Sequence, residues 1–229
     1  MRPNGIVIAI DGPAGAGKST TAKAVASQLS YLYLDTGAMY RAVALSVLRA
    51  DIDPDDAQAT GDCASRARIE QVASDSGTRT LLDREDISDF IRTQDVANAA
   101  SRVAVHPPVR EILVRLQKEI GAPGGIVLEG RDTTTAIFPD AELKIFLEAT
   151  VEVRAQRRFR ELSANGGTED LESLRSEIEE RDDRDQRTQS QHGPWPSPGA
   201  TRLDTTGLTI DDQVARIIQL ARDVGAGEP

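Results

Sequence analysis

Residues 5–20 of this 229-residue chain read GIVIAIDGPAGAGKST. Residues 5–10 are apolar or small, as in a strand that is buried on both faces. The turn that follows is rich in glycine and ends in Gly17, Lys18 and Ser19. Residues 20–29 then place apolar side chains at helical spacing. A strand, a glycine-rich turn and a helix in this order form a P-loop, so the stretch predicts an α/β fold.

Each part of this motif has a chemical role toward phosphate. Glycines let successive backbone N–H groups point inward at phosphate oxygens, and the helix N-terminus favours anions. Lys18 is expected to reach the β- and γ-phosphates, and the Ser19 hydroxyl to ligate Mg²⁺. The residues expected to hold a nucleoside triphosphate are Gly12, Pro13, Ala14, Gly15, Ala16, Gly17, Lys18, Ser19 and Thr20.

Composition limits the possible partners. The formal net charge is −10 at pH 7, so a face that binds DNA or RNA would form against the overall negative field. Cys63 is the one cysteine of the sequence, which excludes an internal disulfide and fits a reducing compartment. The sequence shows neither a signal pattern nor an apolar run of membrane-spanning length. We therefore expect a cytoplasmic monomer that binds neither nucleic acid nor membrane.

Strands and helices are expected to alternate along the rest of the chain. Apolar runs predict strands at residues 31–34, 126–128, 143–147 and 201–204, and helical periodicity predicts helices at residues 37–49, 151–162, 171–184 and 210–224. Two short alternating segments, residues 68–72 and 78–82, flank Ser74-Asp75-Ser76-Gly77 and predict a hairpin.

These elements predict a three-layer P-loop fold with a five-stranded parallel sheet. We expect a single domain over residues 1–229, with a core at about 1–52 and 106–229. Residues 53–105 look inserted between core elements, and an inserted lobe suggests a second ligand.

Arginines cluster on the helix predicted at residues 151–162. Arg154, Arg157 and Arg158 fall on adjoining faces at three- and four-residue spacing. One interpretation is a solvated helix balanced by neighbouring glutamates. The other is a cationic lid, because phosphoryl transfer needs positive charge and exclusion of water at the same moment. A glycine-containing segment at residues 163–168 follows, and this position favours a lid at about residues 154–185.

Several stretches together point to one family. They are the phosphate loop, LDTGAMYR at residues 34–41, IRT at 91–93, VR at 109–110, LEGRD at 128–132, FPDA at 138–141 and RDDRD at 181–185. With these, the chain resembles bacterial cytidylate kinases nearly from end to end. The resemblance implies transfer of the γ-phosphate of ATP to CMP or dCMP with Mg²⁺ as cofactor. It also identifies residues 53–105 as the lobe that binds the nucleoside monophosphate.

The resemblance further implies roles for particular residues. The nucleobase pocket would be formed by Thr36, Ser101, Arg110 and Asp132. The acceptor phosphate would be held by Arg41, Arg92 and Arg131, since a planar guanidinium matches two phosphate oxygens. Asp185 would bind the sugar hydroxyls, with Arg181 nearby at the phosphates. Lys18, Ser19, Arg154 and Arg158 would bind the ATP phosphates. The catalytic residues would be Lys18, Arg131, Asp132 and Arg158. Ser19 would ligate Mg²⁺, and Asp35 and Asp11 are the less direct candidates, which would shape the water shell of the ion.

The chain departs from the family pattern at residues 133–134. Thr133 and Thr134 stand where an aliphatic residue and a glycine are usual, which predicts a loss of backbone freedom at that turn. After Asp185, Gln186-Arg187-Thr188 replaces the usual serine and arginine, and Arg187 is the candidate substitute.

Three alternatives stay open on the sequence. One is a P-loop kinase of UMP or another small acceptor, and another is a related protein that has lost its activity through these departures. The third is a nucleotide-dependent switch, which the absence of an Asn-Lys-x-Asp motif and of a basic groove disfavours.

Overall fold

The computed structural model describes residues 2–74, 77–164, 167–190 and 193–226. The chain has an α/β fold with a five-stranded parallel sheet in the strand order β2-β6-β1-β7-β8, and a second sheet in the order β3-β4-β5. The contacts within the chain divide it into two compact units. One unit comprises Met1–Tyr31 and Gly124–Pro229, and the other comprises Leu32–Pro123.

The first unit contains the central strands. They are β1 (Val7–Asp11), β6 (Ile126–Gly130), β7 (Leu143–Glu148) and β8 (Thr201–Asp204). β1 pairs in parallel with β6 and β7, and β7 pairs in parallel with β8. The side chains from Ile6 to Ile10 are at most 1% exposed, as expected for a parallel strand that is covered on both faces. Asp11 ends β1 as the register partner of Gly130.

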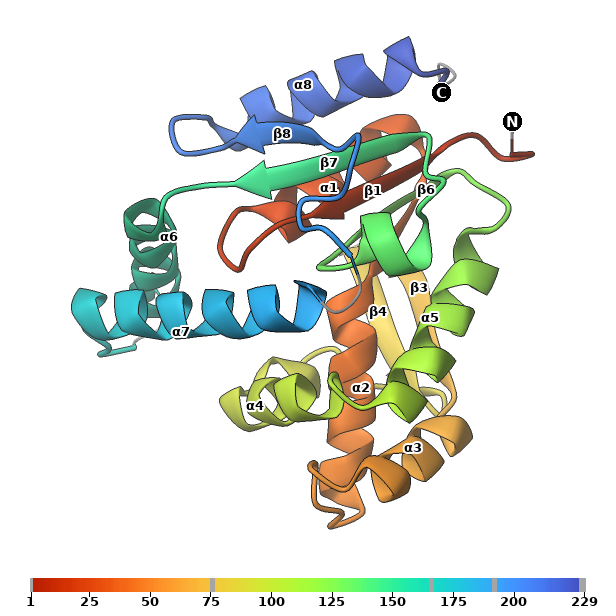
Figure 1. The fold of residues 1–229 in the computed structure, drawn as a ribbon, viewed down its shortest axis with the longest axis vertical. Coiled ribbons are helices and arrows are strands. Elements are labelled where there is room, and N and C mark those ends of the chain that lie inside the picture. The colour runs from red at the N-terminus through yellow and green to blue at the C-terminus, as the bar shows by residue number, and fades with distance from the viewer. Residues whose placement is uncertain (1, 75–76, 165–166, 191–192, 227–229) are drawn as a thin grey trace. The chain divides into compact units, whose positions relative to one another are not determined.

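The first unit also contains four α-helices and a π-helical turn within its described residues. They are α1 (Lys18–Leu29), α6 (Val151–Ala164), α7 (Leu171–Ser190), α8 (Ile210–Asp223) and η2 (Thr133–Ile137). α1 packs against α8, and α6 packs against α7 (Figure 1). Gly17 precedes α1 with a φ of 94°, a left-handed conformation that glycine adopts without steric cost. Among the described residues no side chain caps α1, so its first amides remain available to a ligand.

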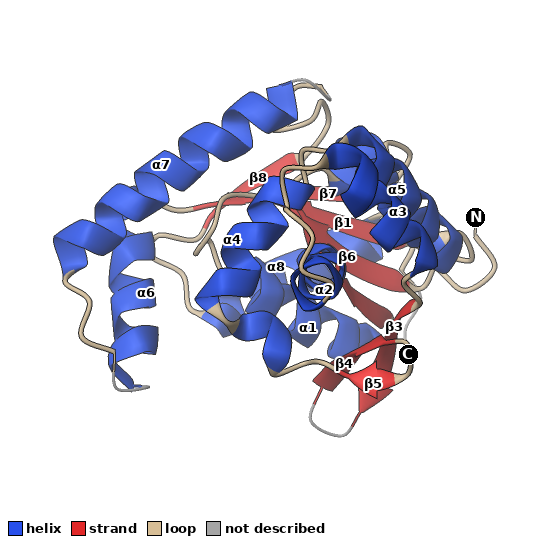
Figure 2. Cartoon of the chain, turned by 90° about the horizontal axis from the view of Figure 1, so that it is seen from below, coloured by secondary structure: helices blue, strands red, loops and turns tan. Residues whose placement is uncertain are grey.

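Besides strand β2 of the five-stranded sheet, the second unit contains helices and the smaller sheet (Figure 2). Its elements are β2 (Leu32–Asp35), α2 (Thr36–Arg49), α3 (Ala57–Arg66), β3 (Ile69–Ser74), β4 (Gly77–Leu82), β5 (Glu85–Asp86), the 3-10 turn η1 (Phe90–Arg92), α4 (Gln94–Val103) and α5 (Pro107–Gly121). α2 packs against α4, and α3 packs against α5. The expected insert at residues 53–105 falls within this unit.

The predicted hairpin is confirmed. β3 and β4 pair in antiparallel register from Ile69 opposite Leu82 to Ser74 opposite Gly77. Asp75 and Ser76 of the predicted turn lie outside the described residues. Within the ranges that the structure describes, every helix is too short or too polar to cross a bilayer.

Candidate active site

The phosphate loop joins β1 to α1 in the first unit. The Lys18 side chain is buried and its Nζ donates a hydrogen bond to the Pro13 carbonyl oxygen at 2.9 Å, so the ammonium group folds back over the loop. At Gly12 a Cβ atom would collide with the Leu147 carbonyl oxygen of β7, which requires glycine at this position. The loop therefore places a lysine ammonium and the open N-terminus of α1 together, and this combination favours a polyphosphate.

The charge on Lys18 depends on several neighbours. Burial lowers the pKa of Lys18 to about 7, and the positive charge of Arg131 acts in the same direction. The negative charges of Glu129 and Asp185 raise this pKa, and Arg181 lowers it. Lys18 therefore belongs to one electrostatic cluster with Glu129 at the end of β6, Arg131 just after it, and two residues of α7.

A hydroxyl and a carboxylate meet at the start of α1. Ser19 Oγ donates a hydrogen bond to Glu129 Oε1 at 2.6 Å, and Glu129 is 6% exposed at the end of β6. Mg²⁺ prefers oxygen ligands and usually binds through one or two protein groups, phosphate oxygens and waters. The pair fits such a site. Ser19 was expected from the phosphate-loop motif, but Glu129 was missed. A carboxylate within an otherwise apolar strand is the feature of the sequence that could have identified Glu129.

The expected carboxylates of the Mg²⁺ shell have other partners. Asp11 accepts hydrogen bonds from the amides and hydroxyls of Thr133 and Thr134. Asp35, in the second unit, accepts from the Ala38 amide at 2.7 Å and from Arg41 at 3.1 Å. Across the described ranges no group of three or more His, Cys, Asp and Glu side chains is suited to hold a metal ion. Ser19 and Glu129 place neighbouring oxygen atoms at the start of α1.

The turn at Thr133 and Thr134 forms without a left-handed residue. The described non-glycine residues with positive φ are Ser30, Asp51, Asp83 and Arg84. Since neither threonine is among them, the turn needs no glycine and the expected loss of backbone freedom does not strain it.

Two arginines of the predicted site pair with carboxylates of α7. Arg131 Nε donates to Asp185 at 2.6 Å. Arg154 is 3% exposed and forms a two-pronged ion pair with Asp182 at 2.6 and 3.0 Å. Arg154 also donates to the carbonyl oxygen of Ala14 in the phosphate loop at 3.1 Å. The structure therefore links the loop to α7 through Arg154.

The other arginines of α6 differ in their contacts. Arg157 donates to the Gly15 carbonyl oxygen at 3.4 Å and to the backbone oxygen and hydroxyl of Thr205 at 2.6 and 3.2 Å. Arg158, expected at the ATP phosphates, is exposed and pairs with Glu161 at 3.0 Å. Of these two neighbours, Arg157 is the one that contacts the phosphate loop. Residues 165–166 of the expected lid lie outside the described residues.

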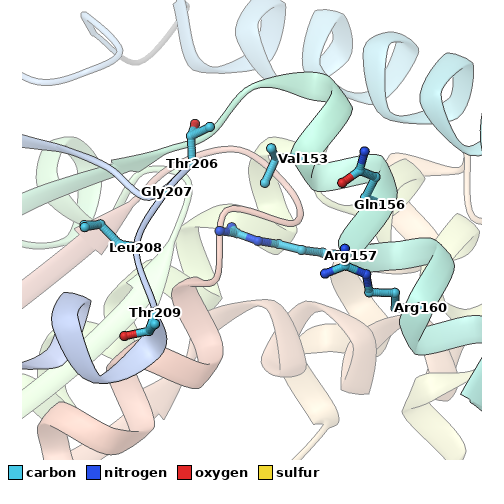
Figure 3. Close-up of a pocket in the computed structure, with 8 residues that line it drawn as sticks. All are labelled: Val153, Gln156, Arg157, Arg160, Thr206, Gly207, Leu208 and Thr209. Carbon is cyan, nitrogen blue, oxygen red and sulfur yellow. The ribbon is translucent and has the colours of Figure 1, made fainter.

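A pocket of about 350 Å³ lies where α6 approaches the loop between β8 and α8. Figure 3 shows Arg157 extending from α6 toward Gly207 and Leu208 of that loop. The lining combines apolar carbon, hydroxyl and guanidinium groups from Val153, Gln156, Arg157, Arg160, Thr206, Gly207, Leu208 and Thr209. Through Arg157 it borders the phosphate loop. The pocket was not predicted from the sequence, because the two segments that line the pocket lie about 50 residues apart in the chain.

The second unit contains the other expected acceptor residues. Thr36 is buried at the first turn of α2, and Arg41 follows on the same helix, paired with Asp35. Three further residues come from neighbouring elements: Arg92 is exposed at the end of η1, Ser101 is exposed on α4, and Arg110 is half-buried on α5. Because η1 and α4 both pack against α2, the unit brings Arg41, Arg92 and Ser101 onto adjoining elements.

Comparison with known proteins covers nearly the whole chain. Residues 8–223 match the family model described as Cytidylate kinase. The cytidylate kinase of Geobacillus thermodenitrificans is 45% identical over 221 residues, which cover 95% of this chain and 97% of the relative. That of Enterococcus faecalis is 44% identical over 220 residues, covering 96% and 97%.

A solved structure extends the comparison to the fold. An uncharacterized protein from Eubacterium ventriosum aligns with a TM-score of 0.55 at 14% identity, over 95% of this chain and 98% of that protein. At this level of identity the likeness concerns the fold alone.

Proposed function

The chain belongs to the cytidylate kinase family, and from this we propose that it transfers the γ-phosphate of ATP to CMP or dCMP, yielding CDP or dCDP. One observation supports the proposal most strongly. In a chain that matches the family over residues 8–223, the phosphate loop holds a buried Lys18 and a Ser19 hydroxyl bonded to Glu129. This is the arrangement that a donor triphosphate and its cation require.

In this proposal the triphosphate lies along the phosphate loop. The backbone amides of residues 14–19 and the Lys18 ammonium bind the β- and γ-phosphates, since the helix N-terminus and the lysine both favour anions. Ser19 and Glu129 would hold Mg²⁺, directly or through water, and the ion would neutralise charge on the phosphates. Glu129 also orients the Ser19 hydroxyl, because it accepts that proton at 2.6 Å.

The donor base is proposed to bind in the pocket shown in Figure 3. The Arg157 guanidinium contacts Gly15 of the loop and Thr205 before α8, so the pocket is continuous with the proposed phosphate position. A planar guanidinium can stack on a purine ring while its edge keeps these hydrogen bonds. Arg157→Ala should therefore raise the KM for ATP more than the KM for CMP.

The acceptor phosphate is proposed to bind Arg131 together with Arg41 and Arg92. Arg131 donates from its Nε to Asp185, and a guanidinium can also donate from its Nη groups to phosphate oxygens. A phosphate monoester is largely ionised at neutral pH. It therefore needs no general base, and catalysis consists of aligning it with the γ-phosphate and neutralising charge.

Recognition of the acceptor's base and sugar completes the proposal. We assign the base to Thr36, Ser101, Arg110 and Asp132, the sugar to Asp185, and a contact with the nearby phosphates to Arg181. The ion pair between Arg131 and Asp185 then lets one acceptor contact both partners, since its phosphate meets the guanidinium and its sugar meets the carboxylate.

A panel of acceptors tests the function. ADP release is measured with CMP, dCMP, UMP, AMP and GMP under the same conditions. We expect the highest kcat/KM with CMP and dCMP. Lys18→Ala should abolish turnover with every acceptor, and Asp132→Ala should chiefly reduce selectivity for cytosine. Equal rates with all five acceptors, or ATP hydrolysis that CMP does not change, would contradict the proposal.

A further inference from the structure

A buried carboxylate at the end of β1 makes four hydrogen bonds to two consecutive threonines. Asp11 is completely buried. Its Oδ1 accepts from the Thr133 amide at 2.9 Å and the Thr133 hydroxyl at 2.6 Å. Its Oδ2 accepts from the Thr134 amide at 3.1 Å and from the Thr134 hydroxyl. Thr133 and Thr134 are at most 2% exposed, so water cannot easily replace either hydroxyl.

These bonds begin where the ladder between β1 and β6 ends. The last register pair of that ladder is Asp11 with Gly130. Beyond it the backbone of β1 turns into the phosphate loop and that of β6 continues through Arg131 and Asp132. Beyond this point the Asp11 carboxylate provides the hydrogen bonds between the two segments. It connects the start of the phosphate loop to Thr133 and Thr134.

The same bonds cap the π-helical turn η2. The amides of Thr135, Ala136 and Ile137 all donate to the Asp132 carbonyl oxygen. The first amides of the turn, those of Thr133 and Thr134, have no acceptor within the turn, as at any helix start. Both donate to the Asp11 carboxylate instead. Asp132 occupies the capping position but makes no side-chain capping bond.

The hydroxyls of Thr133 and Thr134 matter because they stabilise the charged form of the Asp11 side chain. The pKa of Asp11 is raised, chiefly by burial and also by the negative charge of Asp132, and the hydrogen bonds from Thr133 and Thr134 offset part of this shift by stabilising the carboxylate. A hydrogen bond to an ionised group is shorter and stronger than a neutral one. The two threonine hydroxyls therefore add to what the backbone amides alone provide.

We propose that Thr133 and Thr134 are positioning residues, which act through Asp11 to set Arg131 and Asp132 against the phosphate loop. The inference rests on the proposed function, in which Arg131 and Asp132 hold the acceptor. The threonines touch neither substrate. Their hydroxyls fix the direction in which the chain leaves β6, and a small misplacement of a positioned group can reduce a rate by a large factor.

The test compares isosteric variants at the same site. Thr134→Val removes the hydroxyl and keeps the shape of the side chain, while Thr134→Ser keeps the hydroxyl. We expect Thr134→Val to lower kcat/KM for CMP about tenfold or more and to leave the dissociation constant for ATP within about twofold, since the loop's own amides and Lys18 are unchanged. Thr134→Ser should restore most of the activity. The same pair of changes at Thr133 should behave alike.

A matched control separates positioning from stability. Thr60 is also completely buried, and its hydroxyl bonds the Asp56 carbonyl oxygen within α3. Thr60→Val should affect thermal stability and leave both kinetic constants unchanged. A double-mutant cycle adds a second measurement. In an Asp11→Asn background, Thr134→Val should have a much smaller effect than in the wild type, because both changes remove the same interaction.

The outcomes are distinct. If Thr134→Val lowers the melting temperature but leaves kcat/KM for CMP unchanged, or if Thr134→Ser fails to restore it, the positioning role is wrong. Equal losses in ATP binding and in CMP turnover would also overturn it, because they would indicate a general disturbance of the loop. A wild-type protein that phosphorylates no nucleoside monophosphate would overturn the proposed function first, and the inference with it.

Discussion

Binding of ATP should be linked to proton uptake at Lys18. In the free protein its pKa is about 7, so at pH 8 about nine-tenths of the molecules carry an uncharged amine. Bound phosphates favour the ammonium form, because an opposite charge nearby raises the pKa of a lysine. The complex therefore holds a proton that most free molecules lack above pH 7. The affinity for ATP is therefore highest well below pH 7, where Lys18 is protonated, and decreases as the pH rises above the Lys18 pKa.

The size of the effect follows from the pKa. If Lys18 stays protonated in the complex, the apparent dissociation constant is about twice its low-pH value at pH 7 and about tenfold that value at pH 8. This tenfold change in the dissociation constant corresponds to about 1.4 kcal/mol of binding free energy. The expected uptake is roughly half a proton per ATP at pH 7 and about 0.9 at pH 8.

Titration calorimetry without an acceptor measures both quantities. MgATP is titrated between pH 7.0 and 8.5, where its terminal phosphate is nearly fully ionised, in two buffers with different ionisation enthalpies. The difference in heat reports the protons taken up. In Lys18→Met the uptake should vanish and the weaker binding should no longer vary with pH. Constant affinity over this range in the wild type, with no proton uptake at pH 8, would refute the reasoning.

Two neighbours of Lys18 should shift this transition in opposite directions. Arg131→Gln removes a positive charge that lowers the Lys18 pKa, so the loss of affinity should move to higher pH. Asp185→Asn removes a negative charge that raises it, so the loss should begin at lower pH. Shifts in the same direction for both variants would show that the charges do not act on Lys18 as described.

Three further changes have measurable outcomes. Glu129→Gln should raise the Mg²⁺ concentration for half-maximal activity by about tenfold to 100-fold, because groups that orient metal ligands typically have effects of this size; an unchanged Mg²⁺ dependence would exclude this role. Asp182→Asn should lower the free energy of unfolding in urea by about 2 kcal/mol, since buried Arg154 loses its charged partner. Arg84→Gly should raise that free energy by about 1 kcal/mol, because Arg84 has a φ of 74° in the turn between β4 and β5; a loss of stability would contradict this.

The parts of the fold that depend on neighbouring residues could be predicted from the sequence. The strand, turn and helix around Lys18 follow from adjacent residues, and the apolar runs of the central strands are long enough to identify. Helix α4 was missed, although Val96, Ala99, Ala100 and Val103 repeat at helical spacing and Thr93 caps it. Alanines contribute little to a hydrophobic pattern, so its buried face is hard to recognise before its partner α2 is known.

The contacts between distant segments could not be predicted by spacing. Asp11 lies 122 residues from Thr133, and Arg131 lies 54 residues from Asp185. The family pattern suggested that two threonines after Asp132 would restrict the turn, and no pattern within the sequence indicated that their hydroxyls bond Asp11. Similarly, the resemblance placed Arg154 at the ATP phosphates without indicating that Asp182 binds it. Such pairings depend on how the strands and helices pack.

Some of the acidic residues of this chain pair with arginines of the candidate site. Three arginines proposed to bind phosphate pair with carboxylates: Arg41 with Asp35, Arg131 with Asp185 and Arg154 with Asp182. Each carboxylate offsets the charge that a guanidinium would otherwise carry in a poorly hydrated place. A phosphate carries up to two negative charges against the one of a carboxylate, so it can compete for the guanidinium. Small anions with a single charge compete less well. The same pairs would therefore hold these guanidinium groups in position and favour substrates that carry phosphate.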